Sequence, residues 1–135
     1  MNPLQFLKLY GATGVVLFAA DLVWLGVAAK EFYRRNLATL IRPDVRWGPG
    51  LLFYLIYVAA LVVFVVQPAI ERQSLGRALA MGAFFGVTAY ATYDLTSLAM
   101  IRDFPTLVAV VDIVWGAVLT AAAAGVGYAA GRLIA

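Results

Sequence analysis

The chain contains 135 residues, of which 64% are hydrophobic and 13% are charged. A soluble domain carries about 45–50% apolar and about 25% charged residues, so this composition excludes a soluble domain. The sequence has no cysteine and no histidine. This excludes a disulfide or zinc framework, haem held by histidine or cysteine, and any reaction that needs an imidazole or a thiolate.

Four gaps between charged side chains, of 21 to 28 residues, each contain at most one charge. They run from Lys8 to Lys30, from Arg46 to Glu71, from Arg77 to Arg102 and from Asp103 to Arg132. A helix needs about 20 apolar residues to cross about 30 Å of hydrocarbon, and every gap meets that length. The sequence therefore predicts transmembrane helices over residues 5–29, 50–69, 77–101 and 105–131.

These segments are expected to be helices, because lipid offers backbone groups no hydrogen-bond partner and the apolar runs lack the alternation of barrel strands. The expected fold is all-α: one integral membrane domain, 1–135, with four helices in an antiparallel bundle. The apolar run of the first helix is too long for a signal peptide and contains Asp21, so we expect it to be retained. Helices three and four are separated by only 102–105, which predicts antiparallel neighbours, with Pro105 in the first turn of the fourth.

The longest connection, residues 30–48, has two interpretations. Its apolar residues recur at helical spacing between arginines, which indicates a short helix in the membrane interface that ends at Pro43. The residues of this pattern are Phe32, Tyr33, Leu37, Leu40 and Ile41 on one side and Arg34, Arg35 and Arg42 on the other. The alternative is a solvated basic loop that only fixes topology.

The charges also predict orientation. Six basic residues lie on the side of the first and third connections and four on the other side. The positive-inside rule places those connections in the cytoplasm, in the inner membrane of a bacterial cell. We attribute the net charge of +3 to contact with anionic lipid and not to nucleic-acid binding. Arg34, Arg35 and Arg102, at the membrane rim, are candidates for lipid headgroup contacts.

Three aspartates lie inside the predicted helices, where a charge costs about 2.5–3.5 kcal/mol on insertion scales. Asp21 precedes Lys30 by nine residues, Asp94 precedes Arg102 by eight, and Asp112 follows Asp103 by nine. At about 1.5 Å per residue all three lie roughly 12–14 Å below the same membrane face. We therefore expect the three carboxyl groups to form one buried layer.

Other polar side chains occur at the same depth, and small residues accompany them. The expected ligand- or proton-binding residues are Asp21, Asp94, Asp112, Tyr54, Tyr57, Tyr90, Tyr93 and Ser97. Small residues let helices approach closely, so the stripes that contain them are expected to face inward. The stripes are Gly11, Gly14, Phe18 and Asp21; Gly82, Gly86, Tyr90, Asp94 and Ser97; and Asp112, Gly116, Thr120, Ala124, Gly127 and Gly131.

Two tetrapeptides, Asp21-Leu-Val-Trp24 and Asp112-Ile-Val-Trp115, differ only in Leu for Ile. In each, the tryptophan follows the aspartate by three residues and lies on nearly the same helix face. We interpret the match as an Asp–Trp pair on each helix. Trp24 and Trp115 are expected to pack as an aromatic wall.

Several functions fit a buried aspartate and tyrosine site. An isolated carboxylate in a low dielectric loses less free energy by taking up a proton than by staying ionised, which favours proton-linked binding or transport of a small cationic, polar or lipid-like ligand. One alternative is a lipid-modifying enzyme or its accessory subunit, although each helix supplies only one acid and no nucleophile has a nearby base. Another is a structural protein without a ligand. The sequence predicts no catalytic residue, metal or cofactor. The expected partners are membrane lipid and a second copy of the chain or another membrane protein.

The sequence resembles a family of bacterial predicted membrane proteins, domain of unknown function 2177. The segments that carry the resemblance are Asp21-Leu-Val-Trp24, Phe32-Tyr33, Phe53-Tyr54, Gly82-Ala-Phe-Phe-Gly86, Ala89-Tyr-Ala-Thr-Tyr-Asp94-Leu-Thr-Ser-Leu-Ala99 and Asp112-Ile-Val-Trp-Gly116. The resemblance implies a small integral membrane protein of about four helices. It transfers no activity, and it directs the expected ligand toward a lipid or an acyl chain.

Overall fold

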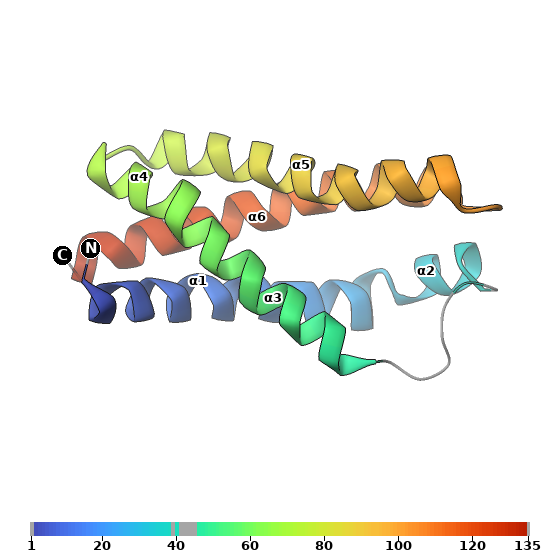
Figure 1. Cartoon of the computed structure of the whole chain (residues 1–135), viewed down its shortest axis with the longest axis horizontal. Helices are drawn as coiled ribbons and strands as arrows, with labels where there is room; N and C mark the ends of the chain where they lie inside the picture. Colours follow the sequence, from blue (N-terminus) through green and yellow to red (C-terminus); the bar gives the residue numbers. More distant parts are fainter. Residues whose placement is uncertain (1, 39, 41–45, 135) are drawn as a thin grey trace.

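A computed structural model describes residues 2–38, 40 and 46–134 of the chain, without the side chain of Ile134. Helices account for almost all of these residues, and no strand occurs among them, which confirms the all-α class. In chain order the α-helices are α1 (Pro3–Val23), α2 (Lys30–Asn36), α3 (Trp47–Leu61), α4 (Gln67–Glu71), α5 (Leu75–Met100) and α6 (Thr106–Ile134). Both chain ends lie at one end of the molecule and α2 lies at the other (Figure 1).

Helix boundaries follow local chemistry. The Asn2 side chain accepts a hydrogen bond from the backbone N–H of Gln5, and the Gln5 side chain accepts one from the backbone N–H of Asn2, so α1 begins with a capping box. Ser74 caps α5 in the same way, by accepting from the backbone N–H of Arg77 at 3.0 Å. The turn between α5 and α6 contains Asp103 with a φ of 63°, a left-handed conformation that aspartate tolerates better than most side chains.

Two of the long helices widen into π-helical segments. After α1, Trp24–Ala28 is π-helical, and the backbone N–H of Ala29 reaches the carbonyl of Trp24 at 2.8 Å. Val62–Val66 is π-helical between α3 and α4. A π-helical turn changes the direction in which later side chains point, and such turns are frequent at functional sites.

Three helices in the described part of the chain are long and apolar enough to cross a membrane: Pro3–Ala28, Trp47–Glu71 and Thr106–Leu133. The predicted crossing over 77–101 falls on α5, which has 26 residues. Tyrosines, threonines and Asp94 make α5 less apolar than the other three. Length and composition therefore confirm three of the four predicted spans.

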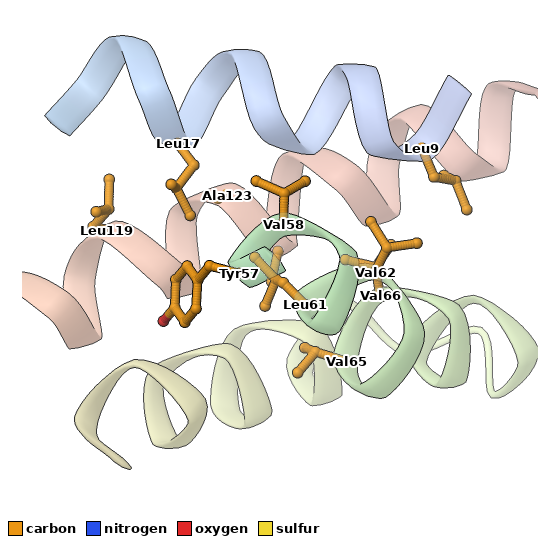
Figure 2. Packing of buried hydrophobic residues seen from close by; sticks show 11 residues of the cluster. Leu9, Leu17, Tyr57, Val58, Leu61, Val62, Val65, Val66, Leu119 and Ala123 are labelled. Carbon is orange, nitrogen blue, oxygen red and sulfur yellow. The ribbon is translucent and has the colours of Figure 1, made fainter. Parts of the chain in front are cut away.

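Helices α5 and α6 pack along each other, and α3 crosses the other long helices obliquely (Figure 1). The apolar core lies where α3 and its π-helical continuation meet α1 and α6, as Figure 2 shows. Its fully buried members include Leu17, Leu61, Val62, Val66 and Ala123. A lipid-exposed helix gains little by burying apolar surface, so close packing has to hold this core together.

Glycines make that close packing possible. A Cβ on Gly82 would lie 2.9 Å from the Cβ of Ala124, and one on Gly86 would lie 2.7 Å from the carbonyl carbon of Gly116. The expected small-residue stripes of α5 and α6 therefore face each other at these positions, whereas Gly127 and Gly131 of α6 face Thr13 on α1 and Ile70 on α4. The stripe expected on the first helix is wrong at Gly11, which is exposed and has nothing within 4 Å of its Cβ position. The buried face of α1 consists of Leu9, Thr13, Leu17 and Asp21. These residues are four apart and so lie on one side of the helix, and Gly11 lies on another side.

The connection between the first two long helices contains α2. Phe32, Tyr33 and Leu37 pack on a buried cluster at the N-terminal end of α6. Phe104, Val108 and Ala109 form this cluster. The charged residues of α2 face outward. A helix is thus present over part of the expected interfacial segment, whereas Ile41, Arg42 and Pro43 lie outside the described residues.

Candidate functional site

The three aspartates, of which Asp21 and Asp94 are buried and Asp112 is half-buried, differ in their hydrogen-bond donors. Asp21, 5% exposed, accepts from two neutral donors: the Tyr54 hydroxyl of α3 and, at 3.0 Å, the indole Nε1 of Trp115 on α6. A carboxylate with two directed donors is well satisfied in a low-dielectric interior. Asp21 is therefore held by a tyrosine and a tryptophan from two other helices.

Asp112, on α6, accepts a hydrogen bond from the hydroxyl of Tyr33 on α2. The same hydroxyl accepts from the indole Nε1 of Trp24 at 3.1 Å. Burial raises the pKa of Tyr33 above its usual range, and the hydrogen bond to Asp112 raises it further. Tyr33 thus stays a neutral donor at physiological pH.

Asp94, on α5, is completely buried, and neither a tyrosine nor a tryptophan of the described residues donates a hydrogen bond to it. Neither of its oxygens accepts a hydrogen bond from an N–H or hydroxyl group in the described residues. Its acidic neighbour is the carboxyl group of Asp112 on α6. Ionised carboxylates only accept, so the two groups can be bonded only if a proton lies between them.

The indole rings of Trp24 and Trp115 stack with their centroids 4.4 Å apart and their planes 9° from parallel. Each tryptophan serves the aspartate of the other tetrapeptide: Trp115 donates to Asp21, and Trp24 reaches Asp112 through the hydroxyl of Tyr33. The interpretation of an Asp–Trp pair within each helix is therefore wrong, because the pairs form between helices.

The expected single layer of three acids is thus divided. Asp94 and Asp112 adjoin, and Asp21 is joined to them only through the stacked tryptophans and Tyr33. Within the described residues, no group of three or more acidic side chains lies close enough to hold a metal ion.

The remaining predicted residues are placed around this network. Tyr57 is bonded to Thr120 at 2.9 Å and not to an acid. Tyr90 packs its ring on Gly116, and Ser97 is buried one turn after Asp94. Tyr93 is 58% exposed and packs edge-on against Phe104, so it does not belong to the buried set.

The rim residues are all exposed: Arg34, Arg35 and Arg102. Arg34 forms an ion pair with Glu31 at 3.3 Å. An exposed pair of this kind contributes little to stability, which leaves these guanidinium groups free to contact other anions.

Sequence reasoning did not assign Tyr33 to the site. Its signal was present, because it lies on the apolar side of a short amphipathic segment beside the arginines. What the sequence could not show is that α2 folds back over the end of α6 and brings this hydroxyl to Asp112.

Helices of membrane-crossing length, packed through glycines around a network of buried acids, define a multi-pass helical membrane protein. Residues 6–129 match the family described as "Predicted membrane protein (DUF2177)", and the chain belongs to this family. Comparison with curated proteins and with solved structures found no match.

Proposed function

We propose that the protein crosses the inner membrane of a bacterial cell four times, as an antiparallel bundle, and binds a small ligand in exchange for a proton at Asp94 and Asp112. With 26 residues α5 is about 39 Å long, enough for the fourth crossing. The connection that contains α2 and the turn between α5 and α6 face the cytoplasm in this arrangement. Arg34, Arg35 and Arg102 then contact anionic headgroups, and α2 lies in the interface.

The observation that carries the proposal is the isolation of the Asp94 carboxyl. A fully buried, ionised carboxylate without a donor is very costly, and a shared proton with Asp112 removes that cost. A cation, or a ligand with a hydrogen-bond donor, offers these oxygens the same partner that the proton offers. Ligand and proton therefore compete for the carboxyl oxygens of Asp94 and Asp112.

The titratable groups that face this pair are Tyr33 on α2 and Tyr90 and Tyr93 on α5. Of these, Tyr33 touches Asp112 directly and is neutral. No basic side chain of the described residues lies among them. The ligand class that fits best is cationic or a polar molecule with donors, because the site offers acceptors.

Binding of tetraphenylphosphonium, a lipophilic cation, to the purified protein between pH 5 and pH 9 tests this proposal. If each cation releases one proton, its affinity rises by up to about tenfold per pH unit until the pair is deprotonated. Asp94→Asn is expected to abolish the pH dependence. Asp103→Asn, in the exposed turn, is the matched control and should leave it intact. Binding that is independent of pH in the wild-type protein would contradict proton exchange.

A second candidate is a purely structural role for the network, and one observation favours it. Asp21 and Asp112 already have donors from neighbouring helices, as expected of polar groups that fix helix register. In that case Asp94→Asn, Asp21→Asn and Asp112→Asn all change the yield of folded protein, and none changes cation binding.

A further inference from the structure

The Asp94 carboxyl is enclosed by the protein. Its side chain is 0% exposed, and Ser97, one turn later on the same face of α5, is 7% exposed. Tyr90, one turn before Asp94, packs on Gly116, so this face of α5 lies against α6. A proton or a ligand can exchange at Asp94 only after some part of the protein moves.

Helices α5 and α6 are poorly suited to separate. A Cβ on Gly82 would lie 2.9 Å from the Cβ of Ala124, and one on Gly86 would lie 2.7 Å from the carbonyl carbon of Gly116. The two backbones are thus in close contact over successive turns, and parting them would lose this packing along the whole interface. The element that moves must therefore lie elsewhere around the pair.

Helix α2 covers the pair at one end of that interface. The Tyr33 hydroxyl donates to Asp112, and the indole Nε1 of Trp24 donates to the same hydroxyl at 3.1 Å. Apolar side chains of α2 pack on the buried cluster at the N-terminal end of α6, and Leu98, one turn after Asp94, packs on the same cluster. Figure 1 shows α2 at the same end of the molecule as the turn between α5 and α6. Helix α2 therefore lies over the end of the α5–α6 contact that contains the two acids.

Helix α2 is also weakly attached. None of its seven residues is buried. It follows the π-helical segment Trp24–Ala28, which has no buried residue either, and the backbone between them leaves helical geometry at Ala29, with a φ of −115° and a ψ of 10°. Ala29 itself is buried and so gives α2 a fixed point about which to turn. Segments with few buried apolar contacts open locally at a small fraction of the free energy of global unfolding.

We infer that α2 is a gate over the Asp94–Asp112 pair, hinged at Ala29 and held closed by the hydrogen bond from Tyr33 to Asp112. In the closed state Tyr33 supplies the donor of Asp112 and covers this carboxyl group. When α2 swings away, Asp112 loses that donor, and both carboxyl groups open to the aqueous face on which α2 lies. The gate regulates the site of the proposed function and rests on that proposal for what is exchanged there, whereas the movement of α2 is tested without it.

Thiol labelling tests the movement. The chain contains no cysteine, so one engineered thiol reports on its own surroundings. Ser97→Cys places the thiol one turn from Asp94, and Thr13→Cys, at a completely buried position of α1 beside Gly127, is the matched control. The probe is a water-soluble methanethiosulfonate, added to the full-length protein in maltoside micelles. It should modify Ser97→Cys at least about tenfold faster than Thr13→Cys, because local opening reaches only the first.

The hydrogen bond that holds the gate is tested with the same probe. Tyr33→Phe should speed the modification of Ser97→Cys by about fivefold, the factor that corresponds to one lost neutral hydrogen bond. Equal rates at the Ser97→Cys and Thr13→Cys thiols would mean that the whole protein unfolds, and would overturn the gate. A rate that Tyr33→Phe leaves unchanged would overturn it as well.

A crosslink tests whether the gate controls exchange. Leu37 of α2 and Ala109 of α6 belong to the same apolar cluster, so Leu37→Cys and Ala109→Cys can be joined by a short reducible crosslinker. The crosslink should slow tetraphenylphosphonium binding by about tenfold or more, because the open state is no longer populated, and reduction should restore the rate. Leu37→Cys alone, treated in the same way, should bind as fast as before treatment.

The two proposals fail in different ways. Binding that depends on pH but is equally fast in the crosslinked protein would overturn the gate and support proton exchange. Binding that is independent of pH in the wild type, together with fast labelling of Ser97→Cys, would refute proton exchange and support the movement of α2.

Discussion

The contact between α5 and α6 makes a sharp prediction at Gly86. A Cβ built there overlaps the carbonyl oxygen of Gly116, and it lies 2.7 Å from the carbonyl carbon of Gly116 and 2.9 Å from the Cβ of Thr120. Ordinary contacts of a Cβ begin at 3.4 Å, so α5 must move away by at least 0.7 Å, the difference between 3.4 and 2.7 Å. Backbone atoms of a helix cannot yield as the end of a flexible side chain can.

We expect Gly86→Ala to destabilise the protein by up to about 2 kcal/mol, which is an overpacking cost of about 1–3 kcal/mol less a gain in helix propensity of about 1 kcal/mol. The assay is reversible unfolding in mixed maltoside and dodecyl sulfate micelles, followed by far-UV circular dichroism. Gly76→Ala on the same helix is the control, because only Ser74 Oγ lies near its Cβ position, at 3.9 Å. It should be unchanged or up to about 1 kcal/mol more stable. If Gly86→Ala unfolds no more easily than Gly76→Ala, the described packing of α5 on α6 is wrong.

Three further predictions follow from the network. Tyr33→Phe removes the donor to Asp112 and should loosen α2 by about 1 kcal/mol, measured as faster tryptic cleavage after the exposed Arg35. Because the pKa of Tyr33 is raised on folding, the extra stability of the wild type over Tyr33→Phe should be complete below about pH 10 and should disappear as the pH rises further. A stability difference that grows with pH would contradict this prediction. Trp115→Phe should cost about 0.6–1.7 kcal/mol through the lost bond to Asp21 and abolish the exciton signal of the stacked indoles in near-UV circular dichroism; survival of that signal would show that the rings are not stacked. Thr13→Val should stabilise the protein by about 1 kcal/mol, since the Thr13 hydroxyl is buried without a partner, and a loss of stability in the same unfolding assay would reveal a partner for it.

The sequence was sufficient for the features that lipid imposes directly. Charges are costly in hydrocarbon, so the gaps between them located the long helices to within a few residues of their observed ends. The glycine spacing of α5 and α6 likewise indicated that these faces turn inward. These inferences needed only the periodicity of a helix and the thickness of a membrane.

Features that depend on rotation and crossing of helices were not accessible. The π-helical turn that begins at Trp24 alters the direction of the side chains after it, and no sequence signal marks that turn. The oblique path of α3 decides that Tyr54 meets Asp21 while Tyr57 meets Thr120. A common depth could therefore be predicted for the three acids, but not their division into a pair and a single residue.

The most direct test concerns the proton that we propose Asp94 and Asp112 share. Infrared difference spectroscopy of the protein near neutral pH detects the carbonyl band of a protonated carboxyl group. We expect that band in the wild type, with a downshift in D₂O, and expect Asp94→Asn to remove it while Asp103→Asn retains it. A wild-type spectrum without any protonated carboxyl would mean that Asp94 is ionised and has a partner that the network described above lacks, and the proposed exchange would have no basis.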